Sequence, residues 1–296
     1  MAASHSVSSS NRGAPSGRLD EVSARPSSDP APAGAAPAGA DAPASTHPLD
    51  RPIATLGWGD PLRWLAAGWR DFMHAPRIGL FYGACFALMG WALLGVFKFA
   101  PAYTLALSAG FLLMGPFLCL GLYHASRALE RGHTPSLWSS MGAWQRRGSA
   151  MATFGFILLI VEMLWGRAAM VVFAVSFEGM PAFDGSVAQL LSPDYLPFVV
   201  TYLAVGALFA GLIFAISVVS IPMIMHEQVD AISAGLASLR LVMTQTGVML
   251  WWGFLLSAVV TIGMLPGFLG LLLAGPVVGH ASWHAYRAAM GRVDGD

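Results

Sequence analysis

The chain has 296 residues, of which 56% are hydrophobic and 11% are charged, and its mean hydropathy is +0.62. Soluble domains carry about 25% charged residues, so this composition excludes an ordinary soluble protein and indicates a polytopic membrane protein whose first partner is the lipid bilayer. The formal net charge of zero leaves no basic surface suited to nucleic acid. Cys85 and Cys119 both lie inside apolar runs, which argues against a structural disulfide or a zinc cluster.

The first part of the chain, residues 1–50, is rich in Ala, Pro, Ser and Gly, with scattered charges. It contains no apolar stretch long enough for a signal peptide. Such a segment buries too little surface to offset the entropy of ordering it, so we expect a disordered cytoplasmic tail.

Six apolar segments follow and predict an all-α membrane domain over residues 58–290. In chain order, the predicted spans are residues 78–97, 100–123, 150–177, 197–225, 248–264 and 267–286. The last apolar region is too long for one helix, because about 20 residues already cross the bilayer core. Gly263, Pro266 and Gly267 therefore divide it into a tight hairpin.

Arginine is concentrated on one side of these predicted spans. The arginines on that side are Arg51, Arg63, Arg70, Arg77, Arg127, Arg131, Arg146, Arg147, Arg240, Arg287 and Arg292. The opposite side has Lys98 and a loop with Glu178, Asp184 and Asp194 but no base. The positive-inside rule therefore predicts a bacterial inner-membrane protein with both termini in the cytoplasm.

An internal repeat is predicted from prolines and from two similar decapeptides. The segments “YHASRALERG” and “WHAYRAAMGR” each begin seven residues after a proline, Pro116 or Pro276, and Pro222 lies at the matching depth of the fourth span. Amphipathic segments precede the first, third and fifth spans, namely “PLRWLAAGWRDFM”, “SLWSSMGAWQRRG” and “AISAGLASLRLVM”. We therefore expect three parallel repeats, each an interfacial helix followed by a transmembrane hairpin.

The repeat aligns histidine and aspartate at the cytoplasmic ends of the three second helices. Eight residues after each proline stand His124, Asp230 and His284, and His280 lies one helical turn before His284. Two histidines and a carboxylate can form a site for a divalent metal, and a histidine pair can hold a haem. The alternative is a polar collar that anchors helix ends at the membrane edge and binds no cofactor.

Two charged residues, Glu162 and Arg167, lie deep in the third predicted span. Charge at that depth costs a few kcal/mol or more, so both side chains should face the interior of the bundle. Five residues of helix separate them by roughly 140° around the axis, which strains direct pairing. The alternatives for Arg167 are carbonyl groups near a proline break, or an extended side chain that reaches toward the outer interface. Glu162 lies near mid-membrane, where a carboxyl is expected to be protonated. The two residues are either part of a proton or solute path, or a buried polar network that holds the helix.

Four segments together carry a family resemblance. They are “LLMGPFLCLGLYHASRALERG”, “LWGRAAMVVFAVSF”, “SVVSIPMIMHEQVDAISAGLASLRLVM” and “GFLGLLLAGPVVGHASWHAYR”. They resemble DUF2189, a family of bacterial integral membrane proteins, and the likeness covers about residues 60–290. Some members are labelled as a cytochrome c oxidase subunit, which implies at most a link to respiratory membranes and brings no catalytic residues.

Particular residues match positions that recur in that family. They are Trp165 and Arg167 of a Trp-x-Arg motif, and Val229 and Asp230 of a Val-Asp motif. Where the resemblance implies a charged pair before Val-Asp, this chain has His226-Glu227-Gln228, which weakens a metal-binding role for His226.

Three functions are consistent with the sequence. No Walker, GxSxG, HExxH or CxxC motif occurs, so an enzyme has no positive support. We favour a non-enzymatic accessory or assembly protein within a membrane protein complex, near terminal oxidases. The alternative is a small-solute or proton-coupled transporter, favoured by the parallel repeats and Glu162. A metal- or haem-binding redox protein is third.

Overall fold

The computed structural model describes residues 53–100, 104–143, 148–177, 189, 191–227 and 229–291. Backbone contacts divide the chain into Met1–Ser45 and Thr46–Asp296, and every described residue belongs to the second unit. In the described ranges the only regular secondary structure is helical, which confirms the all-α prediction. The predicted tail at residues 1–50 lies outside the described residues.

Helices occur at each predicted span and at each predicted interfacial segment. In chain order they are α1 (Asp60–His74), α2 (Pro76–Phe99), α3 (Thr104–Glu130), α4 (Leu137–Met141), α5 (Gly148–Ser176), α7 (Leu196–Ser217), α8 (Ser220–Glu227), α9 (Ala231–Thr244), α10 (Thr246–Met264) and α11 (Leu271–Met290). The predicted interfacial helices correspond to α1, α4 and α9. Proline at the first turn of α1, α2 and α7 helps to fix where those helices begin.

Four helical segments in the described ranges are long and apolar enough to cross a membrane. They are Pro76–Phe99, Gly148–Ser176, Leu196–Glu227 and Thr246–Met264. The second and sixth predicted spans are filled by α3 and α11, which are not among these four. Helices are thus confirmed at all six predicted spans, and at four of them the helix is long and apolar enough to cross a membrane. The six-span topology remains a prediction.

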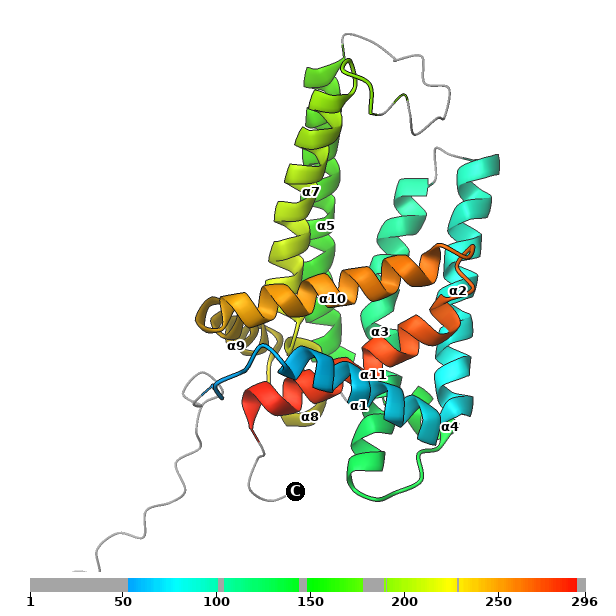
Figure 1. The fold of residues 1–296 in the computed structure, drawn as a ribbon, viewed down its shortest axis with the longest axis vertical. Helices are drawn as coiled ribbons and strands as arrows, with labels where there is room; N and C mark the ends of the chain where they lie inside the picture. The colour runs from blue at the N-terminus through cyan, green and yellow to red at the C-terminus, as the bar shows by residue number, and fades with distance from the viewer. Residues whose placement is uncertain are drawn as a thin grey trace, which may run out of the picture. The chain divides into compact units, whose positions relative to one another are not determined.

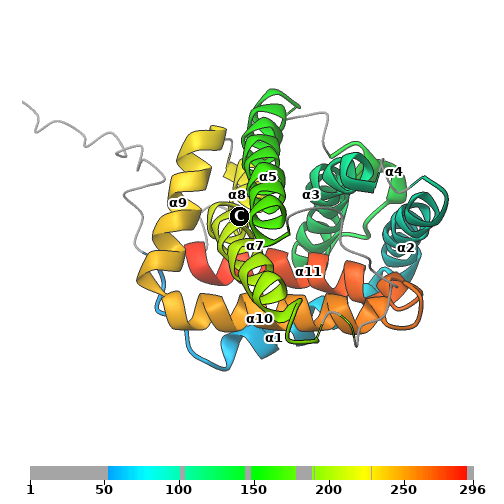
Figure 2. The same ribbon diagram turned by 90° about the horizontal axis from the view of Figure 1, so that it is seen from above.

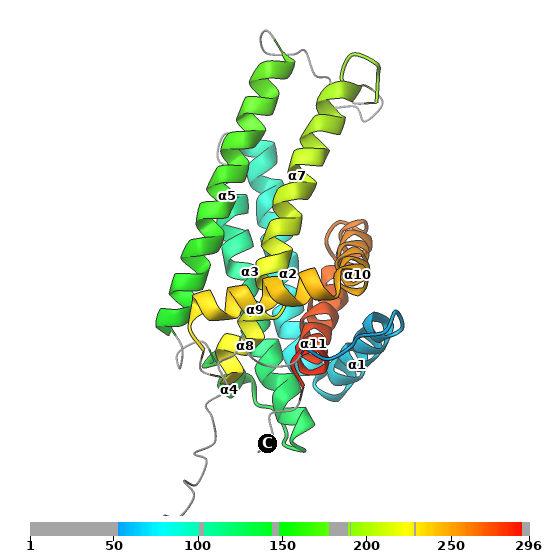
Figure 3. The ribbon, with the colours of Figure 1, turned by 90° about the vertical axis from the view of Figure 1, so that its left-hand side faces the viewer.

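The last helical pair runs in a different direction from the others. Figure 1 shows α2, α3, α5 and α7 upright, whereas α10, α11 and α1 run across them. Figure 3 views α10 and α11 nearly end-on, and Figure 2 shows them lying across helices that are seen more nearly along their axes. Three equivalent hairpins are therefore not visible in the fold, and the threefold repeat stays a prediction.

Small residues explain how α11 can cross its neighbours closely. A Cβ at Gly68 of α1 would meet the backbone of Val277 and Ala281, and a Cβ at Gly83 of α2 would meet the backbone of Leu272. Both contacts are with backbone atoms, which cannot turn aside as a flexible side chain can. These glycines therefore let α1 and α2 approach α11 to backbone contact, much as small residues do between membrane helices generally.

The packed core lies where α11 meets α1, α3, α8 and α10, and α9 contributes to the same core through its contacts with α8. Its largest fully buried side chains include Trp252, Trp283, Tyr286, Leu120, Met223, Ile224 and Leu241. By contrast, the buried residues of α5 lie near its beginning, from Met151 to Leu158, and Ala215 is the buried residue of α7. The α5–α7 hairpin therefore extends well beyond the core, with apolar side chains exposed on its surface.

Candidate functional site

A polar network joins the C-terminal half of α11 to α1 and α3, and we call this region the base of the fold. Nε2 of His284 lies 2.8 Å from Oδ2 of Asp71 on α1. One turn earlier, Nδ1 of His280 lies 2.7 Å from Oγ of Ser126 on α3, and His280 is 0% exposed. Ser126 also hydrogen-bonds to Asp71, so the four side chains form one connected network.

The network fixes the charge of Asp71 and the direction of its hydrogen bonds. Burial by itself raises the pKa of Asp71, but the hydrogen bonds with His284 and Ser126 and the charges of both histidines outweigh burial, so the pKa is lowered. A carboxylate only accepts hydrogen bonds, so Ser126 donates to Asp71 and accepts from Nδ1–H of His280. Nε2 of His280 is buried and has no hydrogen-bond partner among the described residues.

Tyr286 connects α11 to α8 in the same region. Its hydroxyl donates to Oε1 of Glu227 at 2.6 Å and lies 2.8 Å from Nδ1 of His226. Because the single hydroxyl proton goes to the carboxylate, Nδ1 of His226 acts as the donor to Tyr286. His226 also makes edge-to-face contacts with the rings of Trp283 and Tyr286. The structure thus gives His226 a packing and hydrogen-bonding role.

Glu130 connects the end of α3 to α11. Its Oε2 accepts from Nε1 of Trp283 at 3.1 Å, and its Oε1 accepts from Nε of Arg287 at 3.2 Å. Residues at positions 280, 283, 284, 286 and 287 therefore direct hydrogen bonds to three different helices. This arrangement makes the second half of α11 the element that holds the base together.

The predicted metal-binding residues are only partly brought together. His280 and His284 both act on Asp71. Asp230 instead caps α9, where its Oδ2 accepts from the backbone N–H of Ile232 at 3.0 Å and of Ser233 at 2.9 Å. These hydrogen bonds, that of Ser233 above all, lower the pKa of Asp230.

His124 is a half-buried residue of α3. Within the ranges that the structure describes, no group of three or more His, Cys, Asp or Glu side chains is placed to hold a metal ion.

The network residues that the sequence reasoning missed are Asp71, Ser126, Glu130 and Tyr286. Asp71 had one visible signal, since it is a polar residue of an amphipathic segment, but its partner lies more than two hundred residues away in the chain.

The two deep charges on α5 are not paired with each other. Glu162 is half-buried and Arg167 is exposed, and neither forms a hydrogen bond or an ion pair with another residue that the structure describes. The ring of Trp165 makes an edge contact with that of Tyr202, with centroids 6.4 Å apart, and so faces α7. Arg167 lies two residues further, about 200° around the helix, and points away from α7, so the expectation that both charges face the interior of the bundle is wrong for Arg167.

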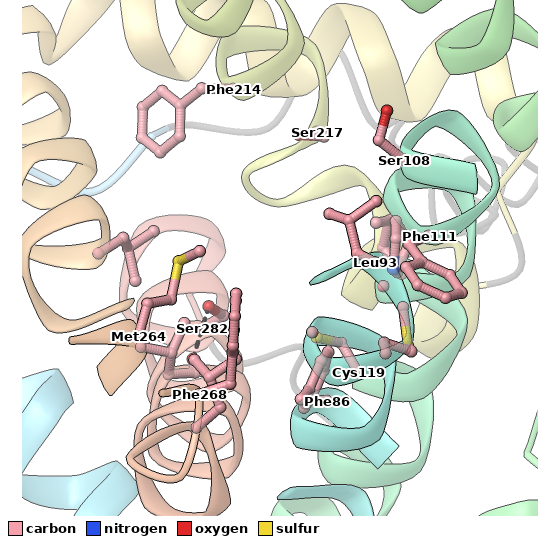
Figure 4. Close-up of a pocket in the computed structure, with 18 of the residues that line it drawn as sticks. Phe86, Leu93, Ser108, Phe111, Cys119, Phe214, Ser217, Met264, Phe268 and Ser282 are labelled. Atoms are coloured by element: carbon pink, nitrogen blue, oxygen red, sulfur yellow. Dashed lines mark hydrogen bonds between the residues drawn. The ribbon is translucent and has the colours of Figure 1, made fainter. Parts of the chain in front are cut away.

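A large, open apolar cavity lies between α2, α3, α7, α10 and α11. Its volume is about 750 Å³. Figure 4 shows Phe86, Phe111, Phe214 and Phe268 around it, with Ser108, Ser217 and Ser282 among the polar lining residues. No charged residue lines the cavity within the described part of the chain, and neither Glu162 nor His280 belongs to its lining.

These features define a class of protein, a multi-pass integral membrane protein built from α-helices. The family comparison agrees, since residues 104–226 match a family described as “Predicted integral membrane protein (DUF2189)”. The resemblance expected over residues 60–290 is thereby confirmed for that shorter range. No curated protein and no solved structure matches the chain.

Proposed function

We propose that the protein is a non-enzymatic accessory or assembly protein of the bacterial inner membrane, which binds a membrane protein partner through the α5–α7 hairpin. The observation that carries this proposal is the exposed charge on α5. Arg167 lies within about 6 Å of the middle of the predicted span, well inside a hydrocarbon core of about 30 Å.

Lipid alone is a poor environment for that arginine. Charged groups in a bilayer pair with other polar groups or face a protein interior, because their desolvation otherwise costs several kcal/mol. A partner helix that presents a carboxylate or another polar acceptor would satisfy Arg167. Glu162 lies about 60° from Trp165 around the helix, at the edge of the α5–α7 contact. From that position it can also contact the proposed partner.

The class of partner that we propose is a respiratory oxidase complex. This assignment rests on the label that some DUF2189 members carry, whereas the binding surface rests on the charges of α5. The two parts can therefore fail separately.

The proposed orientation has both termini in the cytoplasm. Arg63, Arg70 and Arg77 lie on α1 and at the start of α2, and Arg287 lies near the end of α11. Both termini fall on the same side if all six predicted spans cross the membrane, and also if only α2, α3, α5 and α7 cross it while α10 and α11 lie across them, because six and four are both even. A phosphatase fused to the C-terminus, which is active only outside the cytoplasm, should be inactive, and an active fusion would overturn this orientation.

The alternative functions have less support. A transporter of protons or polar solutes needs a polar path to Glu162, but the cavity is apolar and its described lining does not include that residue. A metal-dependent redox protein needs a ligand set, and the described residues supply no group of three metal-binding side chains. For a haem, both histidines of the pair already make hydrogen bonds within the fold, His284 with Asp71 and His280 with Ser126.

Affinity purification from native membranes in a mild detergent tests the proposal. The wild-type chain should recover a membrane partner, and Arg167→Leu or Glu162→Gln should reduce that recovery about tenfold, as expected for the loss of about 1.4 kcal/mol. Arg167→Lys retains the charge, and Met170→Leu is an apolar exchange at an exposed position one turn away, so both should retain the partner.

Equal recovery with folded Arg167→Leu and Glu162→Gln would refute the role of α5. A partner that depends on Arg167 but belongs to another membrane complex would refute only the link to oxidases. Recovery of the chain alone would refute the accessory function. Solute flux in proteoliposomes that disappears with Glu162→Gln would support the transporter instead.

A further inference from the structure

The apolar cavity is open toward the surroundings of the protein, so its apolar walls would face the lipid of a membrane. Its volume of about 750 Å³ falls in the range of about 300–1,000 Å³ that is typical of ligand sites. Something is therefore expected to occupy this space in the membrane.

The polar atoms of the lining are already satisfied. Ser217 donates to the carbonyl of Ile213 at 2.6 Å, and Ser282 donates to that of Val278 at 2.8 Å. Tyr123 hydrogen-bonds with Cys119 and Ser282, and Ser108 also has a partner. Because buried water needs two to four polar partners, these walls are not suited to hold it, and they offer no site for an ion.

The shape of the cavity fits a hydrocarbon chain. Ser108 and Tyr123 both line it and are separated by 15 residues of α3, which correspond to about 22 Å of helix. One leaflet of a bilayer core is about 15 Å deep, so the cavity has room for a whole lipid tail. Aromatic rings from four segments and the flexible side chains of Met89 and Met264 can adapt to such a chain.

We propose that this cavity binds one acyl chain of a membrane phospholipid. The lining has no charged residue and no unsatisfied polar group in the described chain, so the polar head of the lipid must lie outside and only the tail enters. The tail lies between the α2–α3 pair on one side and α7, α10 and α11 on the other (Figure 4). The lipid tail thus fills the space between the α2–α3 pair and the helices α7, α10 and α11, and contacts both.

Two glycines of α3 provide a matched pair of test variants. A Cβ at either Gly110 or Gly115 would meet no atom within 4 Å, but only Gly115 lines the cavity. Gly115→Phe should place a ring in the cavity and exclude the lipid tail, whereas Gly110→Phe should place a ring outside it. Both replacements remove a glycine from a helix interior, so their effects on helix propensity are matched.

The experiment is native mass spectrometry of the full-length protein, purified in a mild detergent and washed with excess detergent. The wild type and Gly110→Phe should keep a single bound phospholipid, and Gly115→Phe should reduce its occupancy about tenfold with unchanged helical content. Gly115→Leu serves as a smaller substitution in case Gly115→Phe misfolds, and it should reduce occupancy in the same direction.

Three outcomes would overturn the inference. They are loss of all lipid from the wild type on washing, equal phospholipid occupancy in folded Gly115 variants, and a bound isoprenoid quinone in place of a phospholipid. None of these depends on the α5 charges, so this inference and the proposed partner can fail independently.

Discussion

Replacing Asp71 by alanine should weaken the contacts of α1 with α3 and α11 at the base of the fold. The substitution removes the acceptor of two hydrogen bonds, from Ser126 and His284, in a region where the side chain of Asp71 is 15% exposed. Hydrogen bonds to charged groups contribute about 1.5–3 kcal/mol each, and an unpaired buried donor adds a desolvation cost. We therefore expect Asp71→Ala to lower the free energy of unfolding by about 3 kcal/mol.

Asp60 is the matched control on the same helix. It forms an ion pair with Arg63 at the same 2.8 Å distance, but the Arg63 side chain is 80% exposed. Exposed pairs contribute at most about 1 kcal/mol, and the hydrogen bond that Asp60 accepts from the N–H of Gly57, just before α1, adds about as much. Asp60→Ala should therefore cost less than Asp71→Ala, although the two ion pairs have equal lengths.

The assay is SDS-induced unfolding in mixed micelles, followed by far-UV circular dichroism. A double-mutant cycle between Asp71→Ala and His284→Ala should give a coupling free energy of about 1–2 kcal/mol. If Asp71→Ala were no more destabilising than Asp60→Ala, or if the cycle gave no coupling, the network would not hold α1 to α11 and the reasoning would be refuted.

The pH dependence of this contribution has a definite sign. The pKa of Asp71 is lowered from its ordinary value of 3.8, so the folded protein binds the proton less readily than the unfolded chain. The stability that the carboxylate contributes is therefore present above pH 3.8 and is lost as the pH falls through the lowered pKa. The difference between wild type and Asp71→Ala should shrink on acidification below pH 3.8, and a difference that grew there would contradict the assignment.

Three further predictions follow from single contacts. Asp230→Ala should cost about 1 kcal/mol, because it removes the N-cap of α9, and far-UV circular dichroism during unfolding measures this loss. Gly83→Ala should cost about 1–3 kcal/mol, because its Cβ meets the backbone of Leu272. Gly95 has open space around it, so Gly95→Ala should be neutral or stabilising. If Gly95→Ala were the more destabilising of the two, the close crossing of α2 and α11 would be contradicted. Tyr286→Phe should cost about 1.5–3 kcal/mol by removing the hydrogen bond to a carboxylate of α8, and an unchanged midpoint would rule out that bond.

The helices could be predicted from the sequence because hydropathy and proline positions are local signals. Apolar runs, the Gly-Pro breaks and the amphipathic segments correspond to helices near the predicted boundaries. The direction of the α10–α11 pair could not be predicted in this way. It depends on which surfaces pack closely, and Gly68 and Gly83 reveal their role only when the backbone of α11 is seen against them.

The histidines illustrate a second limit. Helical periodicity correctly places His280 and His284 on one side of a helix, but it does not say which helix stands opposite. The structure places α1 and α3 there, so the partners are Asp71 and Ser126. Asp230 could have been recognised as a cap, since an aspartate directly before an apolar helical segment is a common N-terminal signal.

The contrast between the two polar regions bears on where function lies. At the base, the side chains of Asp71, Ser126, His284 and Tyr286 direct their hydrogen bonds to one another or to neighbouring helices, so their chemistry is used to hold the fold. On α5, Arg167 has no such partner in the described chain, although its desolvation in lipid is costly. Stability alone would favour an apolar residue at that position. An arginine there is better explained by a contact made outside this chain, which is why the partner experiment should begin with α5 and use the base only as a measure of folding.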